Sequence, residues 1–435
     1  MSTKTLCILV AAGLALSVFL TALAQDADTS RVRQAFRMEG GVLKRGGETF
    51  TLRGVESPGL VKTMPTLATL APPLNRLSAV GANTVCFNLY GLSADGAGLA
   101  KETVDAVEAA MAQISWRRIG VVCRVFDPNA SPDAAYRLAA VGAVARAFKD
   151  ERRLVYWIDG PNCSDLVKAF KKEAPDLVVA APEGGDITVV TTKPKQGARE
   201  PVLLVGALPD DAKGSVHFVL PGTDASYAAL DAAMADPVES QPWQPDNPMV
   251  SEQERAEGWT SLFDGKSLTG WWVAGTNKKG FEARDGNIEW AALGASMLLT
   301  RDRYADFVLR LEWRIREGGN SGIFIRAPRG NRASKIGMEI QLQGDYGSPV
   351  DIHTTAAVYD VVAPTKNASK PAGEWNDIEI MVKGSKLKIT MNGEVVQDIN
   401  LDDYEELKYR LREGFIGLQD HGRPVSFRNI RVKKL

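Results

Sequence analysis

The sequence predicts two domains of different fold class. The first is an α/β domain built as a small, degenerate (β/α)8-like barrel, and the second is an antiparallel β-sandwich of jelly-roll type. Three observations support this division. A chain of 435 residues is too long for one ordinary hydrophobic core. Apolar strand patterns alternate with amphipathic helix patterns over residues 31–236, and from residue 257 onward short strands are separated by Gly, Asn and Asp turns.

The first residues have the pattern of a secretory signal peptide. Lys4 precedes an apolar stretch at residues 6–23, and Ala22 and Ala24 form a small-x-small cleavage site. We therefore expect residues 1–24 to be removed and the mature protein to be exported, either to the periplasm or out of the cell. The alternative is an uncleaved anchor, because the apolar stretch is nearly long enough to span a bilayer. After cleavage we expect no association with a membrane.

Charge and cysteine usage exclude several classes of function. A formal net charge of −1 gives no basic field, so nucleic acid is not an expected partner. Beyond the signal peptide the chain keeps Cys86, Cys123 and Cys163, without the CxxC or Cys/His spacing of a zinc site. We expect Cys86 and Cys123 to be small core residues. No cofactor is expected, while the involvement of a metal and the oligomeric state are left open.

Eight apolar segments are predicted as strands of the first domain. They are residues 49–55, 82–90, 118–126, 153–159, 176–181, 186–192, 201–208 and 215–222. Helix patterns lie at residues 65–80, 102–118, 131–150 and 164–175. Nearly continuous hydrophobic strands joined by helices indicate a parallel sheet covered on both faces, and eight strands suggest a barrel. The later connections are too short for regular crossovers, so we expect the barrel to be degenerate.

The barrel region resembles the front half of glycosidase barrels in the segments LRGVESPG (52–59), GANTVCFNLYG (81–91) and ARAFKDERRLVYWIDGPN (145–162). In those enzymes the fourth strand ends with Asn followed by the acid/base Glu, whereas here Asn162 is followed by Cys163. A retaining glycosidase needs two carboxyl groups. The domain is therefore interpreted as a scaffold or sugar-recognition module, with Asp159 or Glu183 as a substitute catalyst in the alternative view.

Residues 237–256 contain four prolines and no apolar periodicity, which predicts an extended linker. The sandwich would then occupy residues 257–435.

Three predicted strands of the sandwich place polar side chains on the face opposite their core residues. In residues 322–326, 337–343 and 415–421, apolar residues occupy alternate positions. The opposite positions include Arg326, Glu339, Gln341, Gln419 and His421. Such groups on one face can bind a polyhydroxylated ligand and move a proton on it. The alternative is an ordinary solvated face with pairs such as Glu339 and Arg326, although Gln and His are uncommon choices for such a face.

Seven motifs cover nearly all of the second domain. They are GWTSLFDGKSLTGW, GGNSGIFIR, GMEIQLQGDYG, TAAVYDVVAP, KPAGEWNDIEI, MNGEVVQDI and GFIGLQDHGRPVSFRNIRVKKL. In these motifs and their order, the domain resembles the 3-keto-disaccharide hydrolase family. The resemblance implies a concanavalin/laminin-G-like sandwich that cleaves glycosidic bonds of sugars oxidised at C3. The family tends to have Thr-Gly-Ala before Tyr-Asp, whereas this chain has Ala356 at the glycine position, which alters the backbone near Tyr359.

On this resemblance we expect a glycoside hydrolase or lyase that acts on 3-keto glycosides or disaccharides, with a carbohydrate as its partner. A C3 ketone acidifies the C2 hydrogen, so elimination followed by hydration gives net hydrolysis. We assign Glu339 as general base, Arg326 as enolate stabiliser and His421 as acid. The expected hydroxyl-binding residues are Asn320, Gln341, Tyr359, Asp360, Asn376 and Gln419, with Trp375 as a stacking surface or, alternatively, a core residue.

A second class of function is a non-catalytic, lectin-like carbohydrate-binding module on a glycosidase-derived scaffold, because fold alone does not decide activity. A cell-surface adhesion module is a third. Binding alone needs hydrogen bonds but no titrating imidazole, so Glu339 and His421 favour the enzyme.

Overall fold

The computed structural model describes residues 34–127, 132–191, 201–236, 239, 249–274, 280–292, 297–330 and 332–435. Two compact units are present. Of the described residues, one unit contains those from 34 to 70 and from 83 to 226, and the other contains those from 71 to 82 and from 227 onward. The predicted signal peptide and most of the predicted linker lie outside the described residues, and the domain boundaries stay predictions. No helix in the described ranges combines the length and apolarity needed to cross a bilayer.

The first unit is built on a closed barrel of eight parallel strands. Its strands are β4 (Arg53–Glu56), β5 (Thr84–Asn88), β6 (Gly120–Arg124), β7 (Leu154–Trp157), β8 (Val178–Ala181), β9 (Ile187–Val190), β10 (Val202–Val205) and β11 (His217–Leu220). They follow one another around the barrel in chain order, and β11 pairs with β4 to close it. Seven of these strands fall within the predicted segments, and β4 extends one residue beyond the segment 49–55. Runs of Val, Ile and Leu buried on both faces are readable from sequence.

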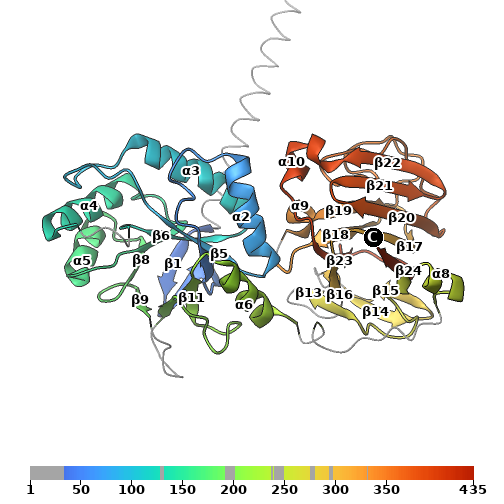
Figure 1. Cartoon of the computed structure of the whole chain (residues 1–435), viewed down its shortest axis with the longest axis horizontal. Coiled ribbons are helices and arrows are strands. Elements are labelled where there is room, and N and C mark those ends of the chain that lie inside the picture. Colours follow the sequence, from blue (N-terminus) through green and yellow to red (C-terminus); the bar gives the residue numbers. More distant parts are fainter. Residues whose placement is uncertain are drawn as a thin grey trace, which may run out of the picture. The chain divides into compact units, whose positions relative to one another are not determined.

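Helices follow the early strands, as expected. They are α2 (Leu67–Ala79), α3 (Lys101–Trp116), α4 (Ala134–Ala147) and α5 (Cys163–Glu173), and Figure 1 shows α3, α4 and α5 around the outside of the barrel. Residues 182–186 alone join β8 to β9. The sequence interpretation missed helix α6 (Asp224–Met234), which follows the last barrel strand.

A small antiparallel sheet precedes the barrel and packs into its interior. It consists of β1 (Phe36–Glu39), β2 (Val42–Arg45) and β3 (Glu48–Thr49). Phe36 and Leu43 join the barrel core. The cysteines Cys86, Cys123 and Cys163 are all buried and free, which agrees with a structural role.

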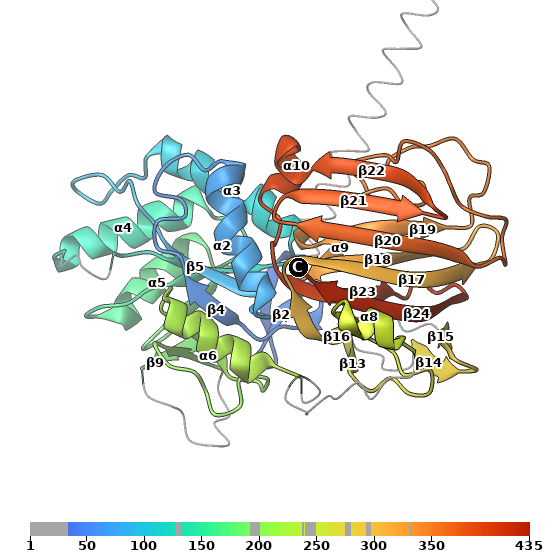
Figure 2. The same ribbon diagram turned by 45° about the vertical axis from the view of Figure 1, so that its right-hand side comes forward.

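The second unit is a sandwich of two antiparallel sheets. The larger sheet has the order β14-β15-β24-β17-β20-β21-β22, with β12 paired to β24, and the smaller has the order β13-β16-β23-β18-β19. The larger sheet contains β12 (Trp259–Ser261), β14 (Phe281–Arg284), β15 (Asn287–Trp290), β17 (Phe307–Ile315), β20 (Asn376–Lys383), β21 (Lys386–Met391), β22 (Glu394–Asn400) and β24 (Val425–Lys434). The smaller sheet contains β13 (Trp271–Ala274), β16 (Met297–Tyr304), β18 (Asn320–Ala327), β19 (Met338–Gln343) and β23 (Gly414–Gln419). Figure 2 shows β17, β20, β21 and β22 side by side in one layer.

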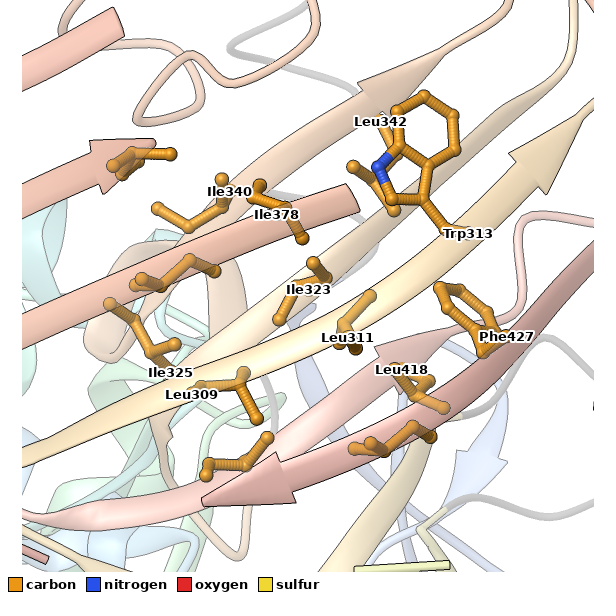
Figure 3. Packing of buried hydrophobic residues seen from close by; sticks show 14 of the residues in the cluster. Leu309, Leu311, Trp313, Ile323, Ile325, Ile340, Leu342, Ile378, Leu418 and Phe427 are labelled. Carbon is orange, nitrogen blue, oxygen red and sulfur yellow. The ribbon is translucent and has the colours of Figure 1, made fainter. Parts of the chain in front are cut away.

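The core of the sandwich lies between the two sheets. Leu309, Leu311 and Trp313 alternate along β17 and meet Ile323 and Ile340 of the smaller sheet (Figure 3). Alternation along β17 is strict, with every second residue buried. The polar positions of the smaller sheet therefore face away from this core.

Short helical turns join some of these strands, namely α8 (Glu252–Ala256), α9 (Ala333–Ile336), the 3-10 turn η1 (Leu401–Asp403) and α10 (Glu405–Lys408). Helix α8 lies inside the segment predicted as an extended linker, so that prediction is wrong for its last residues. The reason is a capping box, in which Ser251 and Glu254 bond to each other's backbone N–H groups.

Candidate active site

The outer face of the smaller sheet carries the candidate site in three cross-strand rows over β23, β18 and β19. The first row contains Glu339 of β19, which lies opposite Phe324 of β18. The second row contains Gln341 opposite Gly322, with Gln419 on the far side of that glycine because Leu418 pairs with Ile323. Alternation predicted that each strand directs these polar groups outward, and the strand pairing places those of β19 and β23 on one face.

Glu339 is the acid of this face whose pKa is shifted furthest from its usual value. Its side chain is nearly buried, with 3% of the residue exposed. Burial raises the pKa of Glu339 from its usual 4.5 to about 7, against the opposing effects of a hydrogen bond from Gln419 and the charge of Lys335. A carboxyl group with such a pKa can accept and return a proton near neutral pH.

Gly322 makes the contact between Glu339 and Gln419 possible. A Cβ atom at Gly322 would lie 2.5 Å from Oε1 of Glu339. The carboxylate therefore leans over the glycine into the second row, and any side chain there would displace it.

Gln341 is an amide without a protein partner. It is 1% exposed, and neither its Nε2 nor its Oε1 has a hydrogen-bond partner in the described part of the chain. Oε1 of Gln419 is also buried and has no hydrogen-bond partner among the described residues. Leaving a buried polar group unsatisfied costs about 1–3 kcal/mol. These amides therefore suit a ligand that brings its own hydroxyl groups.

A segment outside the sheet borders Glu339 on one side. Val358 bridges to Ile340, and the Tyr359 N–H donates to the Glu339 carbonyl at 2.9 Å. Burial raises the pKa of Tyr359, and the charge of Glu339 adds to the effect. Ala356 and Asp360 both have left-handed backbone, with φ of +70° and +65°. A glycine at position 356 would adopt this conformation without strain.

Three residues that the sequence interpretation missed or misassigned form a charged cluster beside Tyr359. Lys335 of α9 is ion-paired with Asp360, which the sequence interpretation assigned to hydroxyl binding. Nε2 of His353 lies 3.4 Å from Oδ1 of the same carboxylate, and the His353 ring packs on Tyr359 with centroids 5.2 Å apart. Lys335 and His353 lie outside regular strands, so an argument from strand alternation could not find them.

Arg326 does not lie in this site, which corrects its assignment as enolate stabiliser. A bulge between Phe324 and Ala327 inserts an extra residue, and Arg326 takes a φ of +51°. Its side chain is fully buried, and its Nη2 donates to Asp306 at 3.0 Å. The other guanidinium nitrogens donate to the carbonyls of Ala305 and Gly384. The bulge reverses the side on which the arginine lies, and its role is structural.

Trp375 and Asn376 were also expected at the site, but Asn376 begins β20 of the larger sheet and Trp375 directly precedes that strand. Nδ2 of Asn376 donates to a backbone carbonyl, while its Oδ1 accepts from the backbone N–H of Lys370 and the side chain of Asn392. Trp375 stacks against two guanidinium groups, of which that of Arg428 is 4.0 Å from the ring centroid. Strand β20 pairs with β17 and β21, so neither residue shares a face with Glu339.

The third row lies at the end of the sheet. Asn320 is half-buried at the start of β18, opposite Gln343. His421 is exposed and lies two residues beyond the end of β23. Along a strand, successive rows are roughly 7 Å apart. Because the Glu339 carboxylate leans into the second row, one sugar ring can bridge the gap between it and the row of Asn320.

The barrel has its own charged cluster at the carboxyl ends of its strands. Nη2 of Arg124 lies 2.6 Å from Oδ2 of Asp159, and Nη1 lies 3.9 Å from Glu56. The guanidinium stacks on Trp157 at 4.0 Å. Burial raises the pKa of Glu56, while the charge of Arg124 opposes the shift. The position after Asn162 holds the buried thiol of Cys163, which donates to a backbone carbonyl.

The fold and the motifs of the second unit define its protein class. Residues 258–433 match the family model described as the 3-keto-alpha-glucoside-1,2-lyase-like domain. The match spans nearly the whole sandwich.

Known relatives match the same share of the chain. A 3-keto-disaccharide hydrolase from Bacteroides thetaiotaomicron is 29% identical over 231 residues, covering 41% of this chain and 79% of the relative. Two crystal structures of candidate glycosyl hydrolases from Parabacteroides distasonis ATCC 8503 are similar as well. One is 28% identical, covers 43% of this chain and 98% of its own, and has a TM-score of 0.39. The other is 24% identical, covers 41% and 99%, and has a TM-score of 0.37.

Proposed function

We propose that the sandwich domain cleaves the glycosidic bond of glycosides or disaccharides oxidised at C3, with Glu339 as its general base. The observation that carries the proposal is the Glu339 carboxyl itself, buried, with a pKa of about 7 and within reach of the amide of Gln419. The family match of residues 258–433 supports the same substrate class.

The chemistry requires one group that moves a proton and several that hold hydroxyls. The ionised Glu339 takes the proton from C2, and the C–H electron pair forms the enolate of the C3 ketone. The enolate then reforms the ketone and expels the oxygen on C1, which leaves an enone. Water adds its oxygen to C1 and passes its spare proton to the acid that protonated the leaving oxygen. Glu339, whose carboxyl proton has exchanged with solvent, then protonates C2. The net reaction is hydrolysis, and Glu339 ends as it began.

Binding of the sugar is assigned to the amides of the three rows. Gln341 and Gln419 have unsatisfied amide atoms beside Glu339, and Asn320 extends the same face. We assign His421 as the acid that protonates the leaving oxygen. This assignment requires the aglycone to lie toward the third row.

The test is turnover of a 3-keto glycoside in heavy water by the full chain and by Glu339→Gln. The proposal expects release of the aglycone and deuterium at C2 of the sugar product, and loss of both in the variant. Cleavage without deuterium at C2 would remove the elimination route. Binding of the unoxidised glycoside without any turnover would instead support a lectin.

For the barrel we propose a degenerate glycosidase scaffold. Its acid/base position holds Cys163, and Arg124 is paired with the carboxylates of Glu56 and Asp159. The expected result is that Glu56→Gln leaves turnover of the 3-keto substrate unchanged and that ordinary oligosaccharides are not cleaved. Export is also a proposal and is supported by the N-terminal targeting pattern. Sequencing the N-terminus of the mature protein from the native cell would test it.

A further inference from the structure

The proposed elimination needs positive charge close to the C3 oxygen, and the sequence assigned this task to an arginine that lies elsewhere. An enolate carries its negative charge largely on oxygen, and stabilising that charge lowers the barrier to C2 proton removal. Arg326 is fully buried away from this face, where its guanidinium donates to Ala305, Asp306 and Gly384. Arg410 is also buried, and its Nε and Nη1 donate to the carbonyls of Glu406, Ser334 and Gly337.

Lys335 is the cation on the correct side of Glu339. Lys335 lies in the helical turn α9, four residues before Glu339 in the chain. Its side chain is 30% exposed. Its Nζ lies 5.8 Å from the ring centroid of Tyr359, whose N–H bonds the Glu339 carbonyl. The positive charge of Lys335 lowers the pKa of Glu339, whereas burial of the carboxyl raises it.

Asp360 fixes the Lys335 ammonium but does not occupy all of its N–H donors. Asp360 binds Nζ of Lys335, and His353 lies against the other oxygen of the same carboxylate. An ammonium group has three N–H donors, so two remain after the bond to Asp360. The left-handed backbone at Asp360 turns this carboxylate toward α9.

We propose that Lys335 is the catalytic cation of this site, donating to the C3 oxygen of the bound sugar while Asp360 and His353 position it. When Glu339 removes the C2 proton, the electron pair of the C2–H bond becomes the C2=C3 bond, and the charge that develops on the C3 oxygen is met by the ammonium. Lys335 keeps its own proton throughout the step. The inference depends on the proposed function, because it assigns a role within the same reaction.

The experiment compares Lys335→Met and Lys335→Gln with the full wild-type chain on a 3-keto glycoside. Removing one such donor typically lowers kcat by about 10²–10³-fold, and we expect this loss with little change in KM for an aryl 3-keto glucoside. Lys366→Met is the matched control. Lys366 is also paired with a carboxylate, that of Glu394, but both lie on an exposed surface. The control should keep wild-type kcat.

A second measurement separates catalysis from structure. Deuterium exchange at C2 of a 3-keto sugar that lacks a leaving group reports proton removal alone. It should slow in Lys335→Ala by the same factor as kcat, and added propylammonium should restore part of the rate. Asp360→Asn keeps the ammonium but loosens it, so a smaller loss is expected.

The outcomes are distinguishable. A wild-type chain that cleaves no 3-keto glycoside removes the proposed function and this inference together. A cleaving wild type whose Lys335 variants exchange C2 hydrogen within threefold of its rate removes the inference alone and leaves Lys335 as a structural partner of Asp360.

Discussion

Replacing Glu339 with glutamine should make the protein more stable at alkaline pH while abolishing turnover. Burial raises the pKa of Glu339 from 4.5 to about 7. The native state therefore binds more protons than the unfolded chain between these two values, and its stability falls as pH rises through this window. A shift of about 2.5 units, at 1.36 kcal/mol per unit, corresponds to about 3 kcal/mol at pH 8 as an upper bound.

Glu339→Gln removes this contribution and keeps an oxygen that can accept the hydrogen bond from Gln419. Its free energy of unfolding should nearly match that of the wild type near pH 4 and exceed it by up to about 3 kcal/mol at pH 8. Urea unfolding at a series of pH values measures the difference. Exposed Glu374 provides the control, because Glu374→Gln should give a difference that does not change with pH.

The same pKa governs activity. Since the base must be ionised, kcat/KM of the wild type should rise with pH through about 7, and loss of a general base typically costs about 10²–10⁴-fold. A stability difference that stays constant between pH 5 and pH 8 would show that Glu339 is not buried as an acid of raised pKa. Wild-type activity with no dependence on pH between 6 and 8 would argue against the base assignment.

Three further substitutions test the geometry. Gly322→Ala places a Cβ 2.5 Å from Oε1 of Glu339 and should lower kcat by at least about 10²-fold without unfolding the protein, as circular dichroism can check. Arg326→Met removes the donors to the carbonyls of Ala305 and Gly384 and should lower the free energy of unfolding by about 1–3 kcal/mol, while KM of the folded fraction stays unchanged. Ala356→Gly relieves a left-handed backbone at an L-residue and should raise the melting temperature, with a gain of about 1 kcal/mol.

Much of the site followed from local alternation. A β-strand places successive side chains on opposite faces, so Ile340 in the core fixes Glu339 and Gln341 on the outer face whatever the rest of the chain does. By the same rule, the core position of Leu418 places the next residue, Gln419, on the outer face. The eight barrel strands were also readable, since uninterrupted apolar runs identify strands that are buried on both faces.

Alternation failed where the local backbone departs from a regular strand. The bulge before Ala327 turns the side chain of Arg326 away from the outer face. The residues GIFIR contain no sequence signal for this extra residue. Asn376 and Trp375 failed for a different reason. Alternation says which residues share a side of one strand, but which sheet the strand joins depends on partners far away in sequence.

The sequence by itself determined the strand pattern and the outward direction of Glu339, Gln341 and Gln419, because these depend on residue order within single strands. Tertiary structure alone decided the pKa of Glu339 and the position of Lys335 and His353 around it. Burial and charge are set by whatever lies nearby in space. Here those neighbours come from a helical turn and a loop whose residues carry no periodic signal.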